Sequence, residues 1–199
     1  MIAIIDYGAG NLRSIANALQ KLDADFKILH ERDEFKGIDR IVLPGVGSFG
    51  RASQKLEESG FFLLLQEWIR ADKSFLGICL GMQLLMCDSA ESENSRGLEC
   101  VEGMNLRFRD VKVPHIGWNN VQYLPDEPVF SNIEQNSYFY FVHSYFIEPD
   151  SQDYVIGKTF YGLEFPSVIR RGDVYGVQFH PEKSGETGLQ LLKNWVELC

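Results

Sequence analysis

Short apolar runs alternate with amphipathic segments through the first half of the chain. Four of these runs are bounded by turn residues, at residues 2–5, 26–29, 40–43 and 74–78. Between them, apolar residues recur at helical spacing within residues 12–22 and 61–71, and a further helix is expected from Gly81 to Cys87. Because buried strands that alternate with helices form parallel sheets covered on both faces, the pattern predicts an α/β fold with a parallel sheet.

The second half of the chain is richer in strands. Aromatic and β-branched residues cluster between turn signals at residues 138–142, 153–157, 167–171 and 174–179. A closing helix places Leu192, Trp195, Val196 and Cys199 on one side. No internal repeat or low-complexity linker interrupts the pattern, so we expect one domain spanning residues 1–199.

Composition excludes several classes of function. No stretch approaches the roughly 20 apolar residues of a transmembrane helix, and the first residues lack the basic start of a secretion signal. The net charge of −9 argues against a nucleic-acid partner, which would require clustered Lys and Arg. The four cysteines have no CxxC spacing, so neither a disulfide framework nor a metal site is expected, and the reducing cytoplasm is the expected compartment.

The segment GICLGMQLL (77–85) carries the strongest chemical signal. Cys79 stands at a strand-to-helix junction with Gly77 and Gly81 two residues away on each side, the G-x-C-x-G counterpart of a nucleophile elbow. The amide of Leu80 would lie at a helix N-terminus, where it can stabilise a thiolate and an oxyanion. The alternative is a buried structural cysteine, which we prefer for the cysteines outside this turn, at positions 87, 100 and 199.

A base for Cys79 is available near the C-terminus. An extended run ends in His180-Pro181-Glu182, and residues two apart in an extended chain project to the same side, so Glu182 can orient the imidazole of His180. Read alone, this segment could be a solvated pair at a strand end. The chain has three other histidines. His30 is expected on the surface, whereas His115 and His143 could line the cleft in a positioning or packing role.

Two glycine-rich turns follow strands. In LPGVGSFG (43–50), Val46 or Gly47 is the candidate for a second oxyanion donor, although a plain strand-to-helix turn would have the same composition. DYGAGNL (6–12) fails the dinucleotide fingerprint because Arg13 stands where a third glycine is needed. We therefore expect a tight turn with Asn11 as helix cap, and no cofactor.

These motifs together resemble the class I (triad) glutamine amidotransferases, and more closely the group of glutaminase subunits of imidazole glycerol phosphate synthase. GICLG with FHPE indicates the superfamily, and VPHIGWN (113–119) with YFVHSY (140–145) narrows it. The matching blocks span nearly the whole chain. Glu99-Cys100 departs from the usual small or apolar residues, outside the catalytic blocks.

The resemblance implies a flavodoxin-like, three-layer fold with a mostly parallel sheet and additional strands in the second half. It implies hydrolysis of L-glutamine through a thioester on Cys79, with Gln83, Ser144 and Tyr145 holding the substrate. It also implies a heterodimer with a cyclase subunit, Lys183 lying at the interface. Ammonia would pass to this cyclase, which makes imidazole glycerol phosphate and aminoimidazole carboxamide ribotide in histidine biosynthesis.

Three other functions are compatible with parts of this pattern. A paralogous glutaminase that supplies another synthase, such as one for a surface sugar, would share every motif. A cysteine peptidase on the same fold would lack the glutamine-holding residues after the nucleophile. A non-catalytic regulatory subunit would have no need for Cys79, His180 and Glu182 together.

Overall fold

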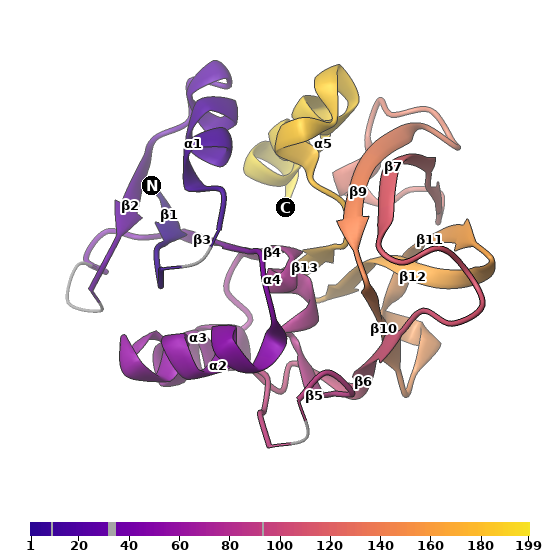
Figure 1. Ribbon diagram of the computed structural model, residues 1–199. Helices are drawn as coiled ribbons and strands as arrows, with labels where there is room; N and C mark the ends of the chain where they lie inside the picture. Colours follow the sequence, from indigo (N-terminus) through magenta and orange to yellow (C-terminus); the bar gives the residue numbers. More distant parts are fainter. Residues whose placement is uncertain (9, 32–34, 93) are drawn as a thin grey trace.

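An eight-stranded sheet forms the centre of the molecule in the computed structural model, which describes residues 1–8, 10–31, 35–92 and 94–199 (Figure 1). Its strands lie in the order β2 (Phe26–Leu29), β1 (Ile2–Ile5), β3 (Arg40–Gly45), β4 (Phe75–Cys79), β13 (Val174–Val177), β12 (Leu163–Arg171), β11 (Val155–Tyr161) and β8 (Gln122–Tyr123). The first five strands are parallel, and the last three pair antiparallel. The prediction of a mostly parallel sheet with additional strands is therefore confirmed.

Helices cover both faces of this sheet (Figure 1). Helices α1 (Leu12–Lys21) and α5 (Gly185–Leu198) lie on one face, and α2 (Phe49–Glu58) and α3 (Phe61–Arg70) lie on the other. Strand β1 shows why every position must be apolar: Ile2 and Ile4 pack with α1 and α5, whereas Ala3 and Ile5 pack with α2 and α3.

Two smaller sheets extend the second half of the chain. One contains β10 (Tyr145–Pro149), β6 (Val101–Arg107) and β5 (Met86–Ser89), and the other pairs β7 (His115–Asn120) with β9 (Tyr138–His143). Aromatic side chains join them to the main sheet, because the ring of Phe165 on β12 lies 5.2 Å from Phe108 and 6.2 Å from Phe141. Short 3-10 helices occur at η2 (Pro128–Phe130), η3 (Gln152–Tyr154) and η4 (Pro181–Lys183).

The expected helix from Gly81 to Cys87 is wrong. Helix α4 (Leu80–Gln83) makes a single turn, after which the chain enters β5. The carbonyl oxygens of Leu84 and Leu85 accept hydrogen bonds from Leu98 and Val101, at 2.6 and 3.0 Å, rather than from a next helical turn. Pairing of β5 with β6 thus overrides the local helical spacing.

Other boundaries also differ from the expectation. Strand β3 continues through Pro44 and Gly45, because beyond Val42 it pairs with β4 alone and a proline is tolerated where one side of a strand is unpaired. Strand β11 begins only at Val155, since η3 precedes it. Asn11 occupies the cap position of α1, but its side chain makes no capping hydrogen bond. Helix α2 and strands β5 to β8 and β10 were not anticipated.

Among the residues that the structure describes, every helix is too short or too polar to cross a membrane.

Candidate active site

Cys79 stands at a strained turn between β4 and α4. Its φ of 55° and ψ of −108° lie in a region that residues with a side chain rarely adopt. The neighbouring glycines allow the turn: a Cβ on Gly81 would lie 1.9 Å from the carbonyl oxygen of Leu43, and one on Gly77 would lie 2.6 Å from that of Gly81. Any residue with a side chain at position 77 or 81 would therefore collide with the backbone at this turn.

The register of the parallel sheet brings the distant parts of the site together. Ile78 on β4 pairs with Val177 on β13, so Cys79 and Gln178 are the next residues at the same edge of the sheet. The side-chain nitrogen Nε2 of Gln178 donates a hydrogen bond to the sulfur of Cys79 at 3.7 Å. His180 follows two residues later, and the structure thus places the thiol and the imidazole in one region.

His180 and Glu182 form a buried pair rather than a solvated one. Nδ1 of His180 lies 2.9 Å from Oε1 of Glu182, and the two side chains are 2% and 1% exposed. The backbone of His180 is also held, because its N–H donates to the carbonyl of Tyr140 at 2.9 Å and its carbonyl accepts from the hydroxyl of Ser184 at 2.6 Å. The imidazole is therefore fixed with Nε2 as its free nitrogen.

The electrostatic environment favours the charged form of His180. Burial by itself lowers the pKa of His180, but interactions with Cys79 and Glu182 outweigh it and raise this pKa to about 9. Nε2 of His180 is buried, and it makes no hydrogen bond to any of the described residues. At neutral pH an imidazolium therefore lies beside the sulfur of Cys79.

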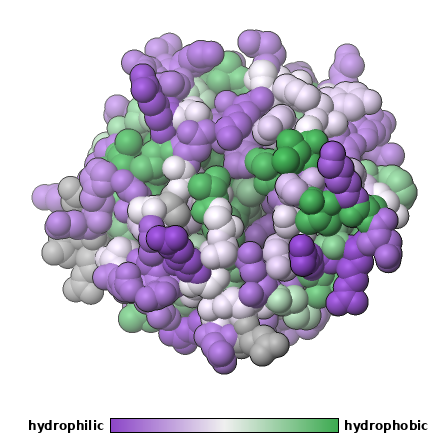
Figure 2. All heavy atoms as spheres, viewed as in Figure 1, coloured by the Kyte–Doolittle hydropathy of each residue, from purple (hydrophilic) through white to green (hydrophobic). Residues whose placement is uncertain are grey.

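A cleft of about 280 Å³ opens beside Cys79. It is lined by Val46, Gly47, Cys79, Leu80, Gln83, Glu91, Pro114, Val142, His143, Ser144 and Tyr145. Figure 2 shows hydrophobic residues around a hollow near the middle of the face on which α4 is seen in Figure 1. The volume of the cleft suits a small molecule rather than a polypeptide.

Eight of the residues singled out in the sequence line this cleft, including both candidate regions for the oxyanion hole. Gly45 pairs with Cys79 across β3 and β4, so Val46 and Gly47 come directly beside the sulfur. Leu80 begins α4. His180 and Glu182 are buried and do not line the cleft, whereas Lys183 is exposed.

Gln178 and Tyr7 are members of the site that the motifs did not single out. Tyr7 is buried and donates its hydroxyl to the carbonyl of Pro44 at 3.0 Å. Burial, and then the negative charge of a Cys79 thiolate, raise the pKa of Tyr7 far above its usual value. The signal for Gln178 was available, since it directly precedes Phe179-His180 at the end of an apolar run.

His143 and His30 lie where they were expected, but His115 is not among the residues that line the cleft. His143 lines the cleft, His115 lies behind it, and His30 is exposed with Nδ1 3.0 Å from a carboxylate oxygen of Asp6. Burial lowers the pKa of His115 to about 4 and that of His143 to about 3. Both are therefore neutral at physiological pH and do not serve as cationic partners for a thiolate.

The other cysteines are poor candidates for a nucleophile. Burial raises the pKa of Cys100 to about 11, and burial is also the main cause that raises the pKa of Cys87 and Cys199. A thiol with a raised pKa is less often in the reactive thiolate form. The structural interpretation of these three residues agrees with this environment.

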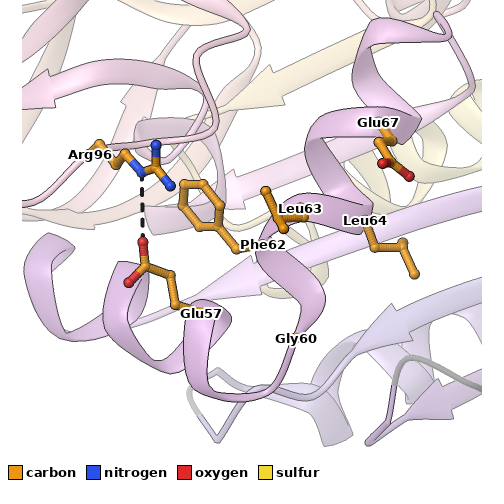
Figure 3. A pocket seen from close by; sticks show the side chains of 7 residues that line it. All are labelled: Glu57, Gly60, Phe62, Leu63, Leu64, Glu67 and Arg96. Atoms are coloured by element: carbon orange, nitrogen blue, oxygen red, sulfur yellow. Dashed lines mark ion pairs between the residues drawn. The ribbon is translucent and has the colours of Figure 1, made fainter.

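A larger groove, of about 590 Å³, lies beside helices α2 and α3 (Figure 3). Arg96 crosses it to Glu57, with Nε 3.6 Å from the carboxylate, and its guanidinium lies 5.0 Å from the ring centre of Phe62. The described residues that line this groove include no cysteine, serine or histidine. We therefore place the chemistry in the smaller cleft at Cys79.

The fold and the site now allow comparison with known proteins. The family model for glutamine amidotransferase class-I matches residues 3–198, and the chain belongs to this family. Within it, the chain is similar to the imidazole glycerol phosphate synthase subunit HisH of Methanocaldococcus jannaschii, with 48% identity over all of both chains. The HisH subunit of Chlorobaculum tepidum is 46% identical, over 99% of this chain and 100% of the relative. These identities over the full length place the chain with the HisH subunits.

Solved structures agree on the fold. A glutamine amidotransferase superposes with a TM-score of 0.76 over 98% of both chains, at 16% identity. PurLQS from Thermotoga maritima gives a TM-score of 0.77 over 98% of this chain and 96% of the other, at 17% identity. The flavodoxin-like class I amidotransferase architecture expected from the sequence is confirmed.

Proposed function

We propose that this chain hydrolyses L-glutamine to L-glutamate and ammonia, with Cys79 as the nucleophile. The observation that carries the assignment is the convergence of an elbow cysteine and a buried His180–Glu182 pair at the carboxyl ends of adjacent strands, beside a small cleft. Membership of the class I glutamine amidotransferases supports glutamine as the substrate.

The first half-reaction is an acyl transfer to sulfur. The Cys79 thiolate attacks the side-chain amide carbon of glutamine, and a C–S bond forms as the carbonyl becomes an oxyanion. The backbone N–H groups of Leu80 and of Val46 or Gly47 are the proposed donors to this oxyanion, and one such donor is worth about 10²–10³ in rate. When the intermediate collapses, the C–N bond breaks and His180 gives its proton to the leaving ammonia.

The second half-reaction returns the enzyme to its starting state. His180 is now neutral, and it takes a proton from the water that attacks the γ-glutamyl thioester. Collapse of the second tetrahedral intermediate breaks the C–S bond, releasing glutamate and the Cys79 thiolate. Glu182 holds the imidazole through Nδ1, so that Nε2 faces the reacting atoms in both steps.

Three residues of the cleft are proposed to hold the amino acid end of glutamine. Gln83, Ser144 and Tyr145 line the side of the cleft formed by α4 and the β9–β10 turn. The side-chain nitrogen Nε2 of Gln83 donates to the backbone carbonyl of Tyr145 at 2.8 Å. This hydrogen bond connects α4 to the β9–β10 turn. Such mutual support presents a rigid wall to a small, polar substrate.

We further propose that the ammonia passes to a cyclase subunit, which makes imidazole glycerol phosphate and aminoimidazole carboxamide ribotide in the cytoplasm. Free ammonia becomes protonated in neutral water and then loses its nucleophilicity, so the glutaminase should dock against the enzyme that consumes it. The similarity to HisH subunits supports this partner.

One rim of the molecule fits such an interface. Trp118 and Tyr138 on the β7–β9 sheet are 55% and 60% exposed, and the ring of Trp118 lies 6.1 Å from that of Tyr140. The carbonyl of Tyr140 accepts the N–H of His180, so these aromatic residues lie near η4, which ends at the exposed Lys183. Exposed Trp and Tyr side chains are typical of protein interfaces.

The test compares glutamate release by the chain alone and with the cyclase subunit and its ligand. We expect a low rate alone and a rate at least tenfold higher in the complex. Lys183→Ala should weaken the stimulation, whereas Lys193→Ala, an exposed lysine on α5, should not. Equal rates with and without the cyclase would reject the coupling.

A second candidate is a paralogous glutaminase that supplies a different synthase. Rescue of a histidine auxotroph lacking its own glutaminase subunit would distinguish the two. Failure to rescue, with glutaminase activity intact in vitro, would favour the paralogue.

A further inference from the structure

A continuous series of hydrogen bonds runs from the outer β7–β9 sheet to the Cys79 sulfur. Its members are Asn119, His115, His143, the Tyr145 carbonyl, Gln83, Gln178 and Cys79, joined at 3.3, 3.0, 2.8, 2.8, 3.1 and 3.7 Å in that order. Apart from Asn119 and Tyr145, these residues are buried. Side-chain amides and imidazoles can donate or accept, so the role of each group must be worked out from its partners.

The Tyr145 carbonyl fixes the direction on both of its sides, because a carbonyl can only accept. On one side, Nδ1 of His143 must carry the proton that it donates to this oxygen, which leaves Nε2 as an acceptor. On the other side, the amide group of Gln83 that faces the carbonyl must be its NH₂.

The outer end of the series gives the same direction independently. Oδ1 of Asn119 accepts the backbone N–H of Asn120 at 2.9 Å, and its NH₂ donates to the carbonyl of Phe160 at 3.0 Å. The NH₂ of Asn119 therefore faces Nε2 of His115, which must accept. Nδ1 of His115 then donates to Nε2 of His143, as the Tyr145 carbonyl requires.

The inner end delivers an N–H group to the sulfur. The NH₂ of Gln83 has two protons, one for the Tyr145 carbonyl and one for Oε1 of Gln178. Since Oε1 of Gln178 accepts from Gln83, its NH₂ is the group that faces Cys79. Gln178 is fully buried, so it cannot exchange this partner for water.

We propose that Gln178 is a positioning residue that donates a hydrogen bond to the Cys79 sulfur and favours its thiolate form, and that the neutral His115–His143 pair maintains this donor through the Tyr145 carbonyl and Gln83. The inference rests on the proposed role of Cys79 as nucleophile. Donation of an N–H to a thiolate is a charge-assisted hydrogen bond, which is stronger than one to a neutral thiol.

Other groups also act on the sulfur. The imidazole of His180, which is hydrogen-bonded to Glu182, lies beside Cys79. The hydroxyl of Tyr7 is close enough for a Cys79 thiolate to raise the pKa of Tyr7. His143 and Glu91 line the same cleft. Because a substitution at position 178 changes none of these groups, its effect is assigned to the hydrogen bond of Gln178.

The experiment measures the pH dependence of Cys79 alkylation by iodoacetamide in the full chain, with the modified cysteine identified by peptide mass spectrometry. Gln178→Met keeps the length of the side chain and removes the donor. Gln178→Glu keeps an acceptor for Gln83 and places a carboxylate at the sulfur. The matched control is Gln54→Met, because Gln54 is an exposed glutamine on α2 that contacts Glu58.

We expect the midpoint of the alkylation curve to rise by about one pH unit in Gln178→Met and by more in Gln178→Glu, with no shift in Gln54→Met. His143→Phe removes the donor to the Tyr145 carbonyl but keeps the hydrogen bond from Gln178 to the sulfur, and it should raise the midpoint by a smaller amount. It therefore tests the proposal even if the Gln178 variants do not fold. Midpoints unchanged from wild type in the folded variants would overturn the proposal.

The proposed function is checked separately on the wild-type chain. Alkylation of Cys79 should remove glutamine hydrolysis in the complex with the cyclase subunit. If hydrolysis survives alkylation, the nucleophile assignment fails. If hydrolysis is lost but the midpoints do not move, only the role of Gln178 fails.

Discussion

His180 Nδ1 and Glu182 Oε1 lie 2.9 Å apart, and both side chains are almost completely removed from solvent. The two residues are separated by Pro181 alone, so the pair is built from local chain geometry. Its consequence is that the imidazole keeps its proton well above neutral pH, because Glu182 and Cys79 together raise its pKa to about 9 against the opposing effect of burial.

This pair predicts the alkaline limit of activity. The proton on His180 is needed for the leaving ammonia, and it is lost as the pH rises through about 9. Glu182→Gln keeps an acceptor for Nδ1 but removes the charge, so the pKa of His180 falls. We expect the alkaline limb of kcat/KM to move down by about one pH unit, measured by glutamate release in the complex.

The control for this shift is Glu186→Gln, since Glu186 is exposed in the first turn of α5. An alkaline limb that stays in place in Glu182→Gln would contradict the role of Glu182.

Cys79→Ala should abolish glutamine turnover without unfolding the chain. The substitution removes the sulfur but no large part of the core, so the free energy of unfolding should change by no more than about 1–2 kcal/mol. Cys87→Ser is the matched control, because Cys87 is only partly buried and lies outside the cleft. Glutamate release and urea unfolding measure the two effects. Substantial hydrolysis by Cys79→Ala would assign the attack to another residue.

Gly81→Ala should destabilise the elbow. The added Cβ would lie 1.9 Å from the carbonyl oxygen of Leu43, so β3 and α4 must separate, at a cost of about 1–3 kcal/mol in the free energy of unfolding. Gly117→Ala is the comparison, because that site has a φ of +134° but no atom within 4 Å of the new Cβ. A smaller loss is expected there, from backbone strain alone. Equal losses in urea titrations would show that packing at the elbow is not the reason for the glycine.

The two buried histidines predict sensitivity to acid. Their pKa values are lowered to about 4 for His115 and about 3 for His143, so the native state binds fewer protons than the unfolded chain below pH 6.5. Native stability is therefore lost as the pH falls from 6.5, by up to about 1.4 kcal/mol per pH unit for each histidine. Unfolding by urea at pH 7 and pH 5 measures this loss.

A His115→Gln/His143→Gln double variant should lose less stability than wild type over the same interval. The control is the variant His30→Gln, which removes an exposed histidine. The explanation fails if the double variant and wild type show the same pH dependence.

Sequence alone was sufficient where the chemistry is local. The apolar runs determined the buried strands of the parallel half, because each such strand must be apolar on both faces. The glycines around Cys79 and the spacing of His180 and Glu182 likewise reported the elbow and the ion pair, since neighbouring residues decide both features. The glycine-rich loop pointed to Val46 or Gly47 and the family resemblance to Gln83, and all three residues line the cleft.

Tertiary structure alone decided which distant segments meet. The helical spacing after Cys79 indicated a longer helix, but pairing of β5 with β6 ends α4 after one turn. Gln178 reaches the sulfur only because β13 lies beside β4, and no periodicity in the chain reports which strands are neighbours. The direction of the buried hydrogen bonds is fixed in the same way by tertiary contacts, among them those of the Tyr145 carbonyl, whose partners come from separate elements.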